Sequence, residues 1–83
     1  MGNRIAAISV LVEDPSSVEA LNSLLHSYAP YILGRMGIPY REKGLNIICL
    51  AIDAPLDVIN TLTGKLGRLN GVSAKAVYSR STN

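Results

Sequence analysis

Two segments of this chain are apolar on both faces of an extended backbone, and this pattern limits the possible fold more than any other feature. Residues 4–13 (RIAAISVLVE) and 45–53 (LNIICLAID) place Ile, Val, Leu or Ala in both of their alternating sets of side chains. Successive side chains of a strand point to opposite faces of a sheet. Each segment therefore predicts a central strand that is covered on both sides.

Helix signals follow each of these strands. Asp14 can cap the free amides of a helix and Pro15 suits its first turn. The helix should end before Pro30, because proline disfavours the α conformation of the preceding residue. A second helix opens at Pro55 and stops at Gly71, and apolar residues recur at helical spacing in both segments.

Residues 31–40 (YILGRMGIPY) predict a strand of a different kind. Gly34 and Gly37 interrupt its apolar residues, and Pro39 removes a hydrogen-bond donor. Glycines in strands often mark bulges and prolines are confined to edges, so we expect a kinked edge strand. The remaining segments are a polar turn, a last strand and a polar tail, at 41–44, 72–78 and 79–83.

The element order β-α-β-β-α-β predicts an α+β, ferredoxin-like fold in a single domain spanning residues 1–83. Right-handed crossovers would place both helices on one face of a four-stranded antiparallel sheet. The other face would then expose more Ile, Leu, Val and Ala than a soluble monomer normally does. We therefore expect a homo-oligomer, either a dimer or a tetramer. The alternative is a monomer in which Ala and Ser dilute the apolar patch.

The length and composition of the chain indicate that its own core gives only limited stability. The 83 residues are 48% apolar and 17% charged, and a chain of this length buries only a modest core. Cys49 is the single cysteine, which excludes a disulfide within the chain. Association of copies is therefore the stabilising device that composition leaves open.

Few residues offer the side chains that catalysis or metal binding requires. His26 and Cys49 are each the only residue of their type, whereas a transition-metal site needs several converging ligands. The serines lack a nucleophile motif, and the carboxylates are spread along the chain. We expect no enzyme, no cofactor and no metal; the alternative is a site that His26 from two subunits forms together. With a net charge of +2 and no basic run, we expect no direct nucleic-acid binding.

The chain also lacks membrane and secretion signals. The N-terminal residues have no apolar signal-peptide core, and no apolar stretch reaches membrane-spanning length. We expect a cytoplasmic protein that does not bind membranes.

The segment 34–41 (GRMGIPYR) is the best candidate for a ligand-binding site. Its two arginines can hold a carboxylate or phosphate, its tyrosine can stack or hydrogen-bond, and its glycines let the backbone approach a ligand. The alternative is an irregular edge strand whose glycines form bulges and whose arginines are solvated. The candidate ligand-binding residues are Gly34, Arg35, Met36, Gly37, Tyr40 and Arg41, together with His26.

Several stretches of the chain carry a family resemblance. They are 26–28 (HSY), 32–40 (ILGRMGIPY), 52–55 (IDAP) and 64–72 (GKLGRLNGV), with Lys75 and Tyr78 after them. Together they resemble the family of iron-only hydrogenase system regulators over nearly the whole chain, and the GRMGIPY run is the most specific part. The resemblance implies an ACT-like ferredoxin fold, similar to the C-terminal domain of the nickel-responsive repressor.

The same resemblance implies assembly through sheets, an effector at a subunit interface and a regulatory role near hydrogenase maturation. The nickel repressor uses several His and a Cys as ligands, whereas this chain has one of each, so nickel binding does not carry over. The chain has no separate DNA-binding ribbon or helix-turn-helix, so regulation would act through a small effector or a protein partner. We therefore expect an oligomerising, ligand-sensing regulator. The alternatives are a structural assembly module without ligand and a metal-binding protein with an interface site.

Overall fold

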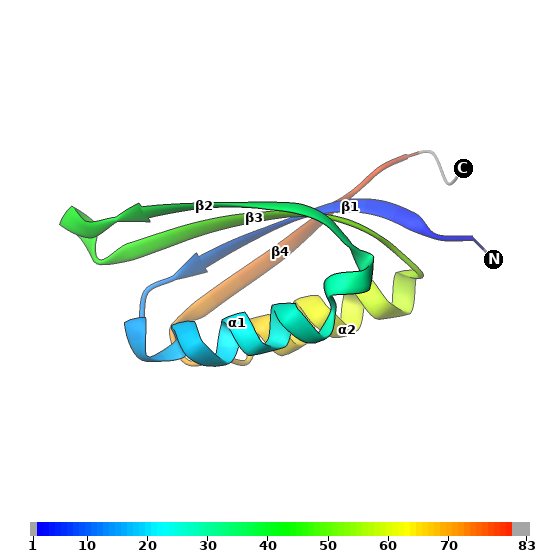
Figure 1. The fold of residues 1–83 in the computed structure, drawn as a ribbon. Coiled ribbons are helices and arrows are strands. Elements are labelled where there is room, and N and C mark those ends of the chain that lie inside the picture. Colours follow the sequence, from blue (N-terminus) through cyan, green and yellow to red (C-terminus); the bar gives the residue numbers. More distant parts are fainter. Residues whose placement is uncertain (1, 81–83) are drawn as a thin grey trace.

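The computed structural model describes residues 2–80, and four strands form one antiparallel sheet with the order β2-β3-β1-β4. Both helices lie in a layer on the same side of this sheet (Figure 1). The strands and helices are β1 (Arg4–Val12), α1 (Val18–Ser27), β2 (Ile32–Tyr40), β3 (Leu45–Ala54), α2 (Leu56–Gly67) and β4 (Val72–Tyr78). Three single-turn 3-10 helices join them, namely η1 (Pro15–Ser17), η2 (Ala29–Tyr31) and η3 (Arg41–Lys43). The predicted βαββαβ ferredoxin-like fold is confirmed.

Most predicted bounds agree with the structure to within one or two residues. β1 ends one residue before the predicted end, because the amide of Glu13 leaves the strand ladder and donates to the carbonyl of Gly71. The first helical segment is split into η1 and α1 rather than being one α-helix from Asp14. Of the tail predicted at 79–83, residues 81–83 lie outside the described residues.

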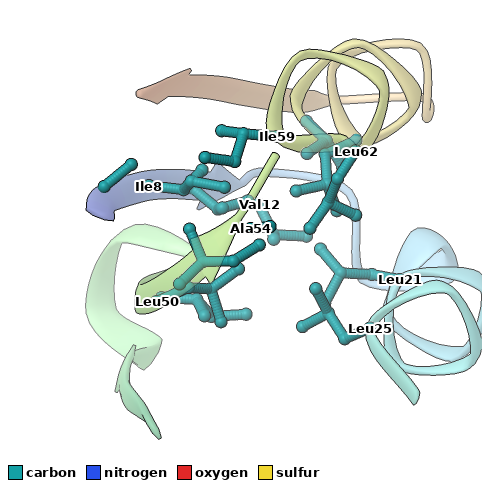
Figure 2. Packing of buried hydrophobic residues seen from close by; sticks show 14 residues of the cluster. Ile8, Val12, Leu21, Leu25, Leu50, Ala54, Ile59 and Leu62 are labelled. Atoms are coloured by element: carbon teal, nitrogen blue, oxygen red, sulfur yellow. The ribbon is translucent and has the colours of Figure 1, made fainter. Parts of the chain in front are cut away.

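The core lies between the sheet and the helices. Along β1, Ile8 and Val10 are completely buried while the adjacent Ala7 and Ser9 are exposed, so one alternating set faces the helices. Figure 2 shows Ile8 of this set in one cluster with leucines of α1 and α2 and with Ile59 of α2. The buried apolar residues are Ala6, Ile8, Val10, Val12, Leu21, Leu25, Ile48, Leu50, Ile52, Ala54, Ile59, Leu62, Leu66 and Val72.

β2 is an edge strand with a bulge, as predicted. Ile32 pairs with Ile52 but Gly34 pairs with Ala51, so Leu33 is an extra residue in the β2 strand. Side chains alternate between the two faces, and one extra residue reverses which set faces the helices. Beyond Leu33, the side chain of Arg35 therefore lies on the helix side of the sheet.

Hydrogen bonds of Asp14 link the loop after β1 to the loop before β4. Its Oδ1 accepts hydrogen bonds from the Ser16 amide at 2.9 Å and from Ser16 Oγ at 2.7 Å. Its Oδ2 accepts a bond from Nδ2 of Asn70 at 2.6 Å. These bonds favour the charged form, so the pKa of Asp14 is lowered, first by the Ser16 hydroxyl and then by the Ser16 amide and Asn70. The predicted capping role of Asp14 is confirmed.

The lowered pKa predicts a contribution of Asp14 to stability that acid removes. The contribution is complete above the ordinary pKa of about 3.8 and is lost as the pH falls through the lower pKa of the folded state. We expect Asp14→Asn, which keeps the shape and loses the charge, to unfold at a lower urea concentration at neutral pH. The variant should also lose less stability than the wild type between neutral pH and pH values below that ordinary pKa. Equal acid losses in both proteins would show that Asp14 titrates alike in the folded and unfolded chains.

Candidate functional site

The side of the sheet that the helices leave uncovered, here called the open face, is predominantly apolar. It exposes large side chains, among them Met36 at 56%, Ile38 at 48% and Val77 at 69% of their surface. The register places the following apolar residues on it: Ile5, Ala7 and Leu11 of β1, Met36, Ile38 and Tyr40 of β2, Leu45, Ile47, Cys49 and Ala51 of β3, and Val77 of β4. The apolar second face predicted from the sequence is therefore present.

The open face is uneven in shape and in polarity. A hollow of about 370 Å³ lies where small residues meet, at Ala7, Gly34 and Ala51. Large side chains of β2 and β3 stand beside this hollow, and Ser9 and Lys75 make the β1–β4 half more polar. The apolar part of the open face is thus concentrated over β2 and β3.

The structure distributes the predicted ligand-binding residues over both faces of the sheet. Gly34, Met36 and Tyr40 lie on the open face, opposite Ala51, Cys49 and Leu45 of β3. Arg35 and Gly37 lie on the helix side, His26 is exposed on α1, and Arg41 lies in η3 at the tip of the β2–β3 hairpin. The seven residues therefore do not form one cluster, and only part of the set can contact a single small ligand.

Arg35 lies in a groove between α1 and β2, here called the α1–β2 groove. Its volume is about 240 Å³, and its floor is made by the core residues Val12, Leu21 and Ile48. Nη2 of Arg35 donates a hydrogen bond of 3.2 Å to Oδ1 of Asn22 on α1. The groove exists because no helix covers the helix-side residues of β2, all of which are exposed beyond the bulge.

Two amides complete the polar lining of the α1–β2 groove. Asn22 comes from α1, and Asn46 of β3 lies opposite Pro39 of β2. Neither residue was among those predicted from the sequence. Asn22 is thirteen positions from Arg35 in the chain, and no spacing motif connects them, because helix packing and strand register bring them together.

His26 lies on the other side of the Arg35–Asn22 hydrogen bond. A second hollow there, of about 360 Å³, is lined by His26, Leu25, Ile32 and the same Asn22 and Arg35. Of the predicted residues, the structure thus brings Arg35 together with Gly37 on one side of this bond and with His26 on the other.

Potential metal ligands are dispersed over the residues that the structure describes. Within residues 2–80, no three side chains of His, Cys, Asp or Glu come close enough together to hold a metal ion. Cys49 is partly buried on the open face, and His26 is exposed on α1. Over the same residues, neither helix has the length and apolar character needed to cross a membrane.

Comparison with solved structures identifies close relatives of the fold. The uncharacterized protein TM1266 from Thermotoga maritima superimposes with a TM-score of 0.90 and 34% identity, covering 94% of this chain and 99% of that one. The ACT domain from GTP pyrophosphokinase of Chlorobium tepidum gives 0.76 and 19% identity, covering 90% and 99%. The C-terminal domain of the MgtC protein from Mycobacterium tuberculosis gives 0.73 and 10%, covering 99% and 94%. The last two share the fold alone.

Comparison with protein families agrees with the TM1266 relationship. Residues 4–76 match the TM1266-like family. No curated protein gives a match. The family match covers most of the chain, and the TM1266 structure aligns along nearly all of it. This chain also shares its fold with an ACT domain. The chain therefore belongs to the TM1266-like family, whose description is "Iron-only hydrogenase system regulator, putative".

Proposed function

We propose that this chain is a non-enzymatic regulatory module of the iron-only hydrogenase system and that it works as an assembly of identical copies. The family description supports the regulatory role. The observation that supports assembly is the open face, where large apolar side chains such as Met36 and Val77 lie in water in a single copy. Apolar patches of a few hundred Å² are among the largest that soluble monomers expose, and patches of that size often mark interaction sites.

The size of the open face is sufficient for an interface between two copies. Strands of seven to ten residues at about 3.3 Å per residue and about 4.8 Å apart give a projected area on the order of 500 Å². Two such faces together bury on the order of 1,000 Å², where specific interfaces begin. Complete burial of an exposed aliphatic side chain contributes roughly 1.5–3 kcal/mol, and the open-face side chains, which are about half exposed, gain about half of that each. Several of them together offset the entropic cost of association.

The shape of the open face favours a second copy as the partner. The face carries projecting side chains, Met36 and Ile38, and also a hollow lined by Ala7, Gly34 and Ala51. In a twofold dimer the same surface occurs on both sides, so one copy can place its projections in the hollow of the other. Two sheets packed in this way lie about 10 Å apart.

A regulator also needs a signal that shifts the assembly between states. We propose that a small effector binds this module and has different affinities for two states of the assembly. β2 supports this coupling, because Arg35 and Gly37 face the α1–β2 groove while Met36 and Ile38 face the open face. A ligand that moves β2 relative to α1 would therefore change the surface that a second copy contacts.

Sedimentation equilibrium on the purified protein tests the assembly directly. At micromolar concentration we expect a dimer or tetramer whose dissociation follows mass action, because burial of the open face drives association. A single species with the mass of one chain throughout this range would overturn the proposed assembly, and with it the proposed mode of regulation.

A further inference from the structure

The α1–β2 groove combines a polar end, an apolar floor and a second polar end. Arg35 pairs with Leu50 of β3, whereas Asn46 pairs with Pro39, four residues further along β2. At about 3.3 Å per residue, these two ends lie about 13 Å apart along the strand. Gly37 pairs with Ile48 halfway between them, over the apolar floor.

The guanidinium of Arg35 has spare hydrogen-bonding capacity. A guanidinium has five N–H donors that match the geometry of a carboxylate. Among the residues that the structure describes, Arg35 donates only to the neutral amide of Asn22, so no carboxylate of this part of the chain compensates its charge. The amide of Asn46 lines the groove without a side-chain hydrogen bond to another described residue. The Arg35 end of the groove is therefore free to bind a charged group of a ligand, while the Asn46 amide stays hydrated beyond the end of a short ligand.

Gly37 keeps the middle of the groove open. A methyl group at this position would meet no atom within 4 Å beyond its neighbours in the chain, and the backbone of Gly37 is not in the left-handed region. A larger residue would therefore fit the strand and fill the groove instead. The chain leaves this space over Val12 and Ile48 empty in the middle of the groove.

We propose that the α1–β2 groove binds a small organic monocarboxylate with an apolar chain. The carboxylate replaces the Asn22 amide as the partner of Arg35, and charge-assisted pairing makes this exchange favourable. The apolar chain lies over Gly37 and Ile48, in a volume of about 240 Å³. Gly37 lies two residues, or about 7 Å, along β2 from Arg35, and an extended chain of about six carbons has a similar length. This inference rests on the proposed function, because it assigns the effector site of the same module.

The test is a titration of the ¹⁵N-labelled full chain with sodium hexanoate, followed by NMR. We expect saturable shifts of the Gly37 and Ile48 amides and of the Arg35 side chain, with a Kd on the order of 1 mM. Arg35→Ala should weaken binding at least about tenfold by removing the charged partner. Gly37→Val should weaken it similarly by filling the groove, and valine is favourable in a strand. Arg68→Ala, which removes an exposed arginine at the end of α2, is the matched control and should leave the Kd unchanged.

Three further ligands decide whether the chemistry is as proposed. Hexylammonium has the same apolar chain with the opposite charge, hexanol has no charge, and inorganic phosphate has charge without an apolar chain. The proposal is overturned if hexylammonium or hexanol binds as tightly as hexanoate, or if phosphate shifts Arg35 equally. It is also overturned if hexanoate shifts only His26 and its neighbours, or gives no saturable shift. Binding that persists in both folded groove variants would contradict it as well.

The titration separates this inference from the proposed assembly. The groove lies within one chain, so the Ile47→Glu variant, designed to remain monomeric, should bind hexanoate at the same residues. Sedimentation without ligand tests the assembly alone. A monomeric wild type that binds hexanoate would overturn the proposed assembly and support the proposed ligand site in the α1–β2 groove. An oligomer that does not bind hexanoate would support the assembly and overturn the ligand site.

Discussion

Replacing Ile47 with glutamate is expected to convert the associated protein into folded monomers. Ile47 is partly buried on the open face, between Leu11 of β1 and Ile38 of β2. In a monomer, glutamate at this position remains in water and costs little. In a face-to-face dimer its charge is buried among aliphatic side chains, at a cost of several kcal/mol. A cost of about 3 kcal/mol weakens association roughly 100-fold.

Sedimentation velocity measures this effect, and Cys49 gives a second readout. Cys49 lies on the open face two residues from Ile47, so its thiol should react slowly with a thiol reagent in the wild-type assembly and faster in Ile47→Glu. Ser23→Glu adds the same charge on an exposed position of α1 and should sediment like the wild type. If Ile47→Glu associates as tightly as the wild type, the interface lies elsewhere on the chain.

Replacing Gly71 with alanine is expected to be among the most destabilising single-methyl additions in this chain. Gly71 has φ +68°, a region that side-chain-bearing residues adopt at a cost of about 1–3 kcal/mol. In addition, a Cβ on Gly71 would lie 2.6 Å from the Cβ of Asp14 and 3.0 Å from its amide nitrogen. The added methyl group therefore pushes apart the two loops that Asp14 and Asn70 join. We expect a loss of about 3 kcal/mol or more in the free energy of unfolding.

Two other glycines separate the causes of this loss in urea unfolding. Gly44 has φ +62° but no neighbouring atom within 4 Å of a Cβ, so Gly44→Ala should lose only about 1–2 kcal/mol from its conformation. Gly64 is within α2, and a Cβ there is 4.0 Å from Nη2 of Arg68, so Gly64→Ala should gain up to about 1 kcal/mol. Equal losses at Gly71 and Gly44 would show that the approach to Asp14 has no cost.

Much of the fold could be predicted from the sequence, because local signals and the global arrangement agree. The alternating pattern of β1 identified a central strand, and the structure places β1 between β3 and β4. Asp14 identified the start of the first helical segment, and its hydrogen bonds to Ser16 confirm that role. The glycines and proline of β2 identified an edge strand. Each of these predictions depends on residues within a few positions of one another.

The candidate site was less predictable, because its geometry depends on distant contacts. The sequence grouped Arg35, Met36 and Tyr40 as one site, yet Arg35 faces the helices while the other two face outward. The alternation of side chains along a strand places Arg35 on the opposite face of the sheet from Gly34 and Met36. Only the pairing of β2 with β3 shows that Arg35 is on the helix side and Met36 on the open face. The contact of Arg35 with Asn22 depends on where α1 packs against the sheet, which no local pattern specifies.

The extra residue at Leu33 has a consequence for how this family can vary in length. If Leu33 were kept but paired in a regular ladder without the bulge, Gly34, Met36, Ile38 and Tyr40 would face the helices, and Arg35 would point into the apolar open face. A relative that lacked Leu33 would therefore lose the bulge and keep both surfaces, whereas one that lost a paired residue between Gly34 and Tyr40 would exchange the faces of the residues beyond the gap. The turn at η3 carries no such constraint, since it lies at the tip of the hairpin. Insertions and deletions should accumulate at that tip, and within β2 the loss of one residue should be tolerated at Leu33 rather than among the paired residues that follow it.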